Sequence, residues 1–102
     1  MELTRQEESI GTVIRVGKDL TIYQVASLRD ELISELEKNE RLVLPLDEVE
    51  TCDAAGIQLL CSARKTADAA GKFVGICMPS SAVLDVIKEL GSNVEDLLDS
   101  EI

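Results

Sequence analysis

The chain has 102 residues, a length typical of one domain that buries roughly two thirds of its unfolded surface. It is 45% hydrophobic, so disorder is not expected, but it carries 20 acidic residues against 10 basic ones and a net charge of −10. That balance repels the phosphates of nucleic acids and anionic membranes, so it argues against nucleic-acid binding and membrane association.

The start of the chain is charged, and no apolar run approaches the length of a membrane span, so we expect a cytoplasmic protein without membrane insertion. The three cysteines, Cys52, Cys61 and Cys77, have no CxxC spacing and are expected to be reduced structural thiols. There is no histidine, which excludes Ser–His and Cys–His nucleophiles and leaves few metal ligands. We therefore expect the chain not to be an enzyme and to bind no cofactor or metal. The one catalytic alternative left open is a reaction of the Cys52 thiol, which lies just before a helix start.

The first half of the chain predicts two strands and a helix. Residues Thr12–Val16 are β-branched and suit a strand, Gly17–Asp19 indicates a turn, and Leu20–Ile22 reads as a short strand that pairs back on the first. The period then becomes helical over Gln24–Lys38, and Asn39 is a stop signal. The apolar stripe of this helix is Val25, Leu28, Leu32 and Leu36, and its charged residues, including Glu35, fall on the other faces.

The centre of the chain predicts a buried strand over Leu42–Leu46, where Pro45 favours a sheet edge or a strand end. An acidic connector, Asp47–Thr51, leads to Asp53, which is a good N-cap for a helix over Ala54–Ala70 that ends at Gly71. One face of this helix is small or apolar: Gly56, Leu59, Leu60, Ala63, Ala67 and Ala70.

The last third predicts a strand over Lys72–Cys77 and a helix over Ala82–Leu90, capped by Ser80 or Ser81. Its apolar face is Val83, Leu84, Ile87 and Leu90. Two strand–helix–strand passages in a row imply parallel pairing. The expected fold class is α/β, a small sandwich with a mixed four- to five-stranded sheet and about three to four helices. We expect one domain with a core of about residues 12–92. The acidic tail, residues 93–102, reads either as a short amphipathic helix or as a frayed end.

After the central strand and the acidic connector, the run Asp53-Ala54-Ala55-Gly56-Ile57-Gln58-Leu59-Leu60 resembles the signature of the STAS family, the anti-sigma factor antagonist fold. In its phospho-switch members the turn reads Asp-Ser-Ser-Gly or Asp-Thr-Ser-Gly, and the phosphorylated serine corresponds to Ala55. The Asp-x-Ala-Gly form also occurs in STAS proteins of chemotaxis operons and phospholipid ABC transporters. STAS sequences commonly carry an aspartate where this chain has Pro45, which is a second departure.

The resemblance implies a non-enzymatic bacterial module for protein–protein interaction that resembles anti-sigma factor antagonists in signal transduction and transcription regulation. The phospho-switch is absent, because neither alanine of the turn has a hydroxyl. The alternative is a regulatory subunit of a chemotaxis signalling assembly or of a phospholipid ABC transporter. The partner would be an anti-sigma factor kinase, a chemotaxis kinase or an ABC ATPase. It would bind at the helix start, which comprises Asp53, Ala54, Ala55, Gly56 and Gln58.

Simpler interpretations of the same residues stay open. Asp53 is also what an ordinary helix cap requires. The carboxylates Asp47, Glu48, Glu50 and Asp53 could gather a divalent cation, although a solvated loop is the favoured interpretation. Thr51 and Ser62 are the hydroxyls nearest to the turn and the alternative phosphorylation sites.

Overall fold

The structure is a computed structural model that describes residues 2–8, 11–91 and 97–98. Eight elements follow one another along the chain: β1 (Glu2–Glu8), β2 (Gly11–Leu20), α1 (Val25–Lys38), β3 (Arg41–Pro45), β4 (Glu48–Cys52), α2 (Ala54–Ala69), β5 (Phe73–Cys77) and α3 (Ser81–Leu90). They form one α/β domain, and the predicted fold class is confirmed: a five-stranded mixed sheet with three helices in the described part of the chain.

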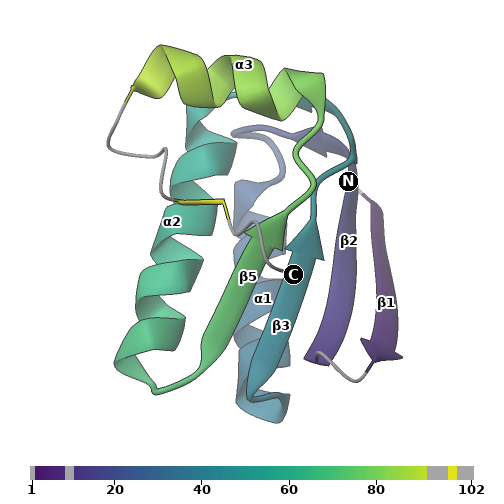
Figure 1. Cartoon of the computed structure of the whole chain (residues 1–102), viewed down its shortest axis with the longest axis vertical. Helices are drawn as coiled ribbons and strands as arrows, with labels where there is room; N and C mark the ends of the chain where they lie inside the picture. The colour runs from purple at the N-terminus through teal and green to yellow at the C-terminus, as the bar shows by residue number, and fades with distance from the viewer. Residues whose placement is uncertain (1, 9–10, 92–96, 99–102) are drawn as a thin grey trace.

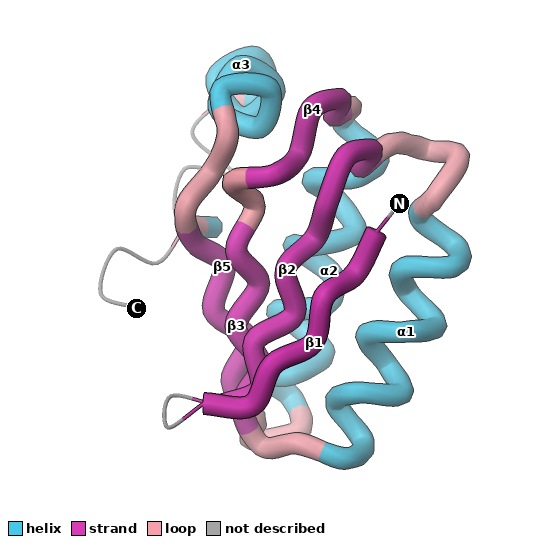
Figure 2. Tube along the Cα trace, turned by 90° about the vertical axis from the view of Figure 1, so that its right-hand side faces the viewer, coloured by secondary structure: helices cyan, strands magenta, loops and turns pink. Residues whose placement is uncertain are grey.

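The sheet runs in the order β1-β2-β3-β5, and β4 pairs with the far end of β2. Strand β1 is antiparallel to β2, whereas the pairs β2–β3, β2–β4 and β3–β5 are parallel, as two strand–helix–strand passages require. Helices α1 and α2 cover one face of the sheet, and α3 lies across the end where the parallel strands finish (Figures 1 and 2).

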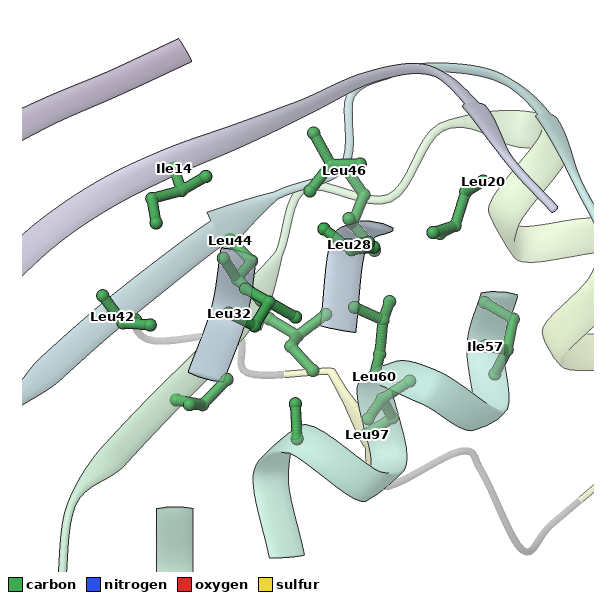
Figure 3. Packing of buried hydrophobic residues seen from close by; sticks show 14 of the residues in the cluster. Ile14, Leu20, Leu28, Leu32, Leu42, Leu44, Leu46, Ile57, Leu60 and Leu97 are labelled. Atoms are coloured by element: carbon green, nitrogen blue, oxygen red, sulfur yellow. The ribbon is translucent and has the colours of Figure 1, made fainter. Parts of the chain in front are cut away.

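The core lies between the sheet and the two covering helices (Figure 3). Leu28 and Leu32 of α1 and Ile57 and Leu60 of α2 are at most 2% exposed. They meet the side chains of the strands that point toward the helices, namely Ile14, Val16, Leu42, Leu44, Val74 and Ile76. The chain thus builds its core almost entirely from aliphatic side chains, which fits its content of one Phe and one Tyr.

The N-terminal part of the sheet differs from the prediction. Residues 11–20 form one continuous strand, so the expected turn at Gly17–Asp19 and the short returning strand at Leu20–Ile22 are wrong. The turn-favouring residues instead make an irregularity within β2: Lys18 has a φ of 54°, and the pairing with β4 shifts between Lys18 and Asp19. The antiparallel partner of β2 is β1, in the charged segment to which no element was assigned.

The acidic connector is also a strand. Glu48–Cys52 pairs with the last residues of β2, and only Val49 of this segment is buried. Pro45 is the last residue of β3, where the missing N–H does not interrupt the strand, so its placement at a strand end is confirmed.

The helices begin and end close to their predicted bounds, with Asp53 capping α2 and Ser80 capping α3. Four face assignments need correction: Glu35 of α1 is buried, Ile57 of α2 is fully buried, and Ala70 and Leu84 are exposed. Leu97 is also buried in the core, but most of the predicted acidic tail lies outside the described residues.

Candidate protein-binding surface

The carboxylate of Asp53 holds the start of α2 and the loop after β2 together. Its Oδ1 accepts a hydrogen bond from Gly56 N at 3.0 Å, which caps the helix, and its Oδ2 accepts one from Ile22 N at 2.9 Å. The backbone N–H of Asp53 donates to the carbonyl oxygen of Leu20 at 3.2 Å. Asp53 is therefore more than a cap, because it joins the ends of β2 and β4 to the first turn of α2.

Gly56 is buried where the first turn of α2 touches the end of β2. A Cβ atom at this position would lie 2.3 Å from the carbonyl oxygen of Leu20 and 2.7 Å from Leu20 Cγ. Real side chains do not approach so closely, so glycine is needed for the helix to sit this near to the strand. This contact fixes the height of the helix start above the sheet.

Two exposed apolar side chains lie on the loop that Asp53 holds. Tyr23 is 90% exposed and Ile22 is 57% exposed, although both sit in an ordered turn. Gln24 accepts two hydrogen bonds from Thr21, from its N–H at 3.1 Å and its hydroxyl at 2.6 Å, and Thr21 Oγ1 accepts one from Tyr23 N at 3.3 Å. The prediction missed these residues because it placed Ile22 in a strand; the signal was a large aromatic residue beside a helix start.

An open hollow of about 310 Å³ lies beside the turn, between the first turns of α1 and α2. Its wall on α2 includes Ala55 and Gln58, and its wall on α1 includes Val25 and Ala26. We give the name α2-start surface to exposed or half-buried residues of the loop before α1 and of the two helix starts: Ile22, Tyr23, Ala26, Asp53, Ala54, Ala55 and Gln58. Of the five residues predicted from the sequence, the structure gathers Asp53, Ala54, Ala55 and Gln58 here, whereas Gly56 is buried beneath it.

The remaining candidates do not form a chemical site. Burial, reinforced by the neighbouring Asp53 carboxylate, raises the pKa of the Cys52 thiol to about 11, so it is a protonated, weak nucleophile near neutral pH. Arg15 pairs with Asp47 and lies 3.6 Å from Glu48, so half of the acidic set is engaged with a cation of the chain itself. The described residues contain no group of three or more potential ligands that could hold a metal ion.

The two alternative hydroxyls are both exposed. Thr51 donates its hydroxyl hydrogen bond to Asp19. Ser62 lies on α2 at the wall of the hollow. Both are therefore accessible from solvent, but neither occupies the first turn of α2, where a phosphate would meet the α2-start surface.

A protein-family model described as "Mlab, STAS domain" matches residues 3–99. The anti-sigma factor antagonist SpoIIAA in its unphosphorylated form superimposes with a TM-score of 0.71, over 88% of this chain and 81% of that one, at 16% identity. The phosphorylated form of SpoIIAA, a Bacillus cell fate determinant, gives a TM-score of 0.67 over 88% of this chain and 84% of that one, at 15% identity.

A serine-to-glutamate variant of RsbS from Moorella thermoacetica gives a TM-score of 0.72, over 96% of this chain and 85% of that one, at 16% identity. At such identities the superpositions establish a shared fold alone. A comparison with curated protein sequences gave no match. In the described residues, no helix has the length and apolar character needed to cross a membrane.

Proposed function

The chain belongs to the STAS domain family, and we propose that it works as a single-domain module that binds a protein partner through the α2-start surface. Domains of this family are generally non-catalytic regulatory modules. The fold is that of anti-sigma factor antagonists, so the first candidate partner is an anti-sigma factor kinase.

The observation that carries the proposal is the exposed pair Ile22 and Tyr23 beside the first turn of α2. Exposed apolar side chains that adjoin one another mark interaction sites more than isolated ones do, and tyrosine is among the residues enriched at binding hot spots. Asp53 fixes the loop before binding, which lowers the entropy that association must overcome. Around the pair, Ala26, Ala54 and Ala55 leave room for a partner to approach closely.

The proposal includes the loss of the phospho-switch at this turn. A phosphoserine adds a charge of about −1.5 to −2, which would have to lose its hydration water at a docking face and would repel acidic groups of the partner. Ala54 and Ala55 have no hydroxyl, so this route of inactivation is closed in the present chain. We infer that its binding is either constitutive or controlled elsewhere.

The second candidate function is that of a regulatory subunit in a chemotaxis assembly or a phospholipid ABC transporter. It is favoured by the Asp53-Ala54-Ala55-Gly56 turn, which resembles the STAS proteins of those systems. Affinity capture from the native cell separates the candidates, because an anti-sigma factor kinase, a chemotaxis kinase and an ABC ATPase differ in identity and size.

The mechanism is tested by adding a negative charge at Ala55. In Ala55→Asp the new carboxylate lies in the first turn of α2, where the helix dipole should stabilise the isolated domain by about 0.3–1 kcal/mol. Against a partner the same carboxylate must lose its water, so affinity for the captured partner should fall at least about tenfold, or about 1.4 kcal/mol. Melting temperature and affinity should therefore move in opposite directions, which misfolding cannot produce.

Two variants serve as controls. Ala55→Ser adds a small neutral hydroxyl and should bind nearly as the parent does. Ser81→Asp adds a carboxylate to the first turn of α3, outside the α2-start surface, and should also leave the affinity unchanged. If Ala55→Asp binds the partner as tightly as these controls, the partner does not dock at the start of α2 and the proposed mechanism is wrong.

A further inference from the structure

A second surface runs along the groove between α1 and α2, on the outside of the molecule. Three adjoining hollows follow this groove: Arg29 and Ser62 line both the first and the second, and Ile33 and Thr66 line both the second and the third. We call this continuous groove the α1–α2 seam. The two helices that form it lie on the same side of the sheet (Figure 2).

The seam is depleted of acidic residues. The chain has 20 of them, but Glu37 is the one acidic residue among the sixteen that line the three hollows, and Arg29 and Lys72 are the other charged ones. Ile33 stands on its wall with 46% of its surface exposed. Depletion of charge around apolar side chains is typical of the centre of a protein–protein interface and unlike a solvated helix face.

The wall on α1 carries a self-complementary stripe, Arg29, Ile33 and Glu37, which we call the α1 stripe. Its residues are four positions apart and therefore share one face, with a cation about 6 Å before Ile33 and an acid about 6 Å after it along the helix axis. Arg29 lies 3.9 Å from Asp30 in an exposed pair, and within the described part of the chain Glu37 has no ion pair. Both charges thus remain available to a partner.

Helix stability does not explain this order of charges. The dipole of α1 favours acids in its first turn and cations in its last, whereas the stripe places the acid Glu37 in the last turn and its cation, Arg29, just after the first. Neither residue has an opposite charge three or four positions away on α1 that would compensate. The position of Glu37 is therefore unfavourable for α1 alone, and a charge-complementary surface would account for it.

We propose that two copies of this chain associate through their α1–α2 seams, with their α1 helices antiparallel around a two-fold axis at Ile33. In this arrangement Ile33 meets Ile33 of the second copy, and Arg29 meets Glu37 of the second copy on both sides of the axis. A two-fold interface requires such a self-complementary patch, in which residue i contacts residue j and j contacts i. The seam shares Ala26, Ala55 and Gln58 with the α2-start surface at one end, but Ile22 and Tyr23, which carry the proposed partner binding, do not line it.

The size of the seam indicates a weak, concentration-dependent dimer. A standard interface buries about 800 Å² and about 20–30 residues on each side, and the sixteen residues of the seam fall below that number. The association must therefore be measured over a wide range of protein concentration, for which sedimentation velocity is suitable.

The experiment exchanges the two charges of the stripe singly and together. Arg29→Glu leaves acids at both ends of the stripe and Glu37→Arg leaves cations at both ends, so each variant alone should associate at least about tenfold more weakly than the parent. The double variant, Arg29→Glu with Glu37→Arg, restores opposite charges across the axis and should recover dimerisation. An equimolar mixture of the two single variants should form a heterodimer, because an all-acidic stripe then faces an all-basic one.

Matched controls separate the stripe from net charge. Lys65→Glu and Glu31→Arg make the same charge changes at exposed residues that do not line the seam, and they should leave the association constant unchanged. All variants should melt within a few degrees of the parent, since every substituted residue is exposed. A parent that stays monomeric at millimolar concentration overturns the proposal. A dimer that persists in both single variants also overturns it. So does a failure of both the double variant and the mixture to recover association.

Discussion

Replacing Gly56 by alanine tests the contact that positions the start of α2. At most helical sites Gly→Ala stabilises a protein by about 1 kcal/mol, because alanine has the higher helix propensity. Here the new methyl carbon would lie 2.3 Å from the carbonyl oxygen of Leu20, more than 1 Å inside ordinary contact. The helix start or the end of β2 must move, and the sign of the effect should reverse.

The magnitude follows from what the movement breaks. Overpacking of this kind costs about 1–3 kcal/mol, and the displaced first turn weakens the hydrogen bond from Gly56 N to Asp53, a cap worth about 1 kcal/mol. After the gain in helix propensity, which offsets about as much as the cap loses, the free energy of unfolding should fall by about 1–3 kcal/mol. For a domain of this size that corresponds to a loss of about 4–24 °C in melting temperature.

The assay is thermal and urea unfolding followed by circular dichroism. Ser62→Gly and Ser62→Ala, made at an exposed site of the same helix, measure the Gly-to-Ala difference without a clash and should favour alanine. If Gly56→Ala melts at or above the temperature of the parent while the Ser62 pair behaves as expected, the close approach of α2 to Leu20 is refuted.

Two further predictions concern the neighbours of this contact. Asp53→Ala removes both acceptors and should lower the free energy of unfolding by about 1–3 kcal/mol in urea melts, whereas Asp53→Asn keeps one acceptor and should lose less; equal losses would contradict the double role of the carboxylate. Because burial raises the pKa of Cys52 to about 11, its thiol should be alkylated far more slowly in the folded than in the denatured chain at pH 8–9, as read by mass spectrometry. The raised pKa also means that the stability contributed by the protonated thiol is present below pH 9 and is lost as the pH rises toward 11. In Cys52→Ala the melting temperature should therefore fall less steeply between pH 9 and 11 than in the parent. An unchanged slope would show that Cys52 does not titrate as inferred.

Much of the order of elements was predictable because it is encoded locally. The apolar period of α1, the caps Asp53 and Ser80, and the stop at Gly71 are short-range signals, and each appears in the structure at or within one residue of its predicted place. Parallel pairing of the central strands followed from the alternation of strands and helices. The Asp53-Ala54-Ala55-Gly56 turn likewise indicates a helix start from adjacent residues alone.

Tertiary structure decided what depends on pairing between distant segments. Strand β1 is a charged segment whose strand character comes from hydrogen bonding to β2, and the acidic connector becomes β4 because the end of β2 offers it a partner. The turn signal at Gly17 became an irregularity inside β2, since the strand has neighbours on both sides there. Local strand and turn propensities are weak compared with such pairing, which is why the prediction from the sequence is wrong for these three segments.

The candidate surfaces divide in the same way. The sequence alone determined that the turn before α2 has no hydroxyl and that Asp53 can cap it, because both are properties of adjacent residues. The tertiary structure placed the loop of Ile22 and Tyr23 beside that turn, where Ile22 donates a hydrogen bond to Asp53, 31 positions further along the chain. It also brought α1 and α2 together to form the seam. Contacts over such separations depend on how the helices pack on the sheet, and that packing arises only when the whole core closes.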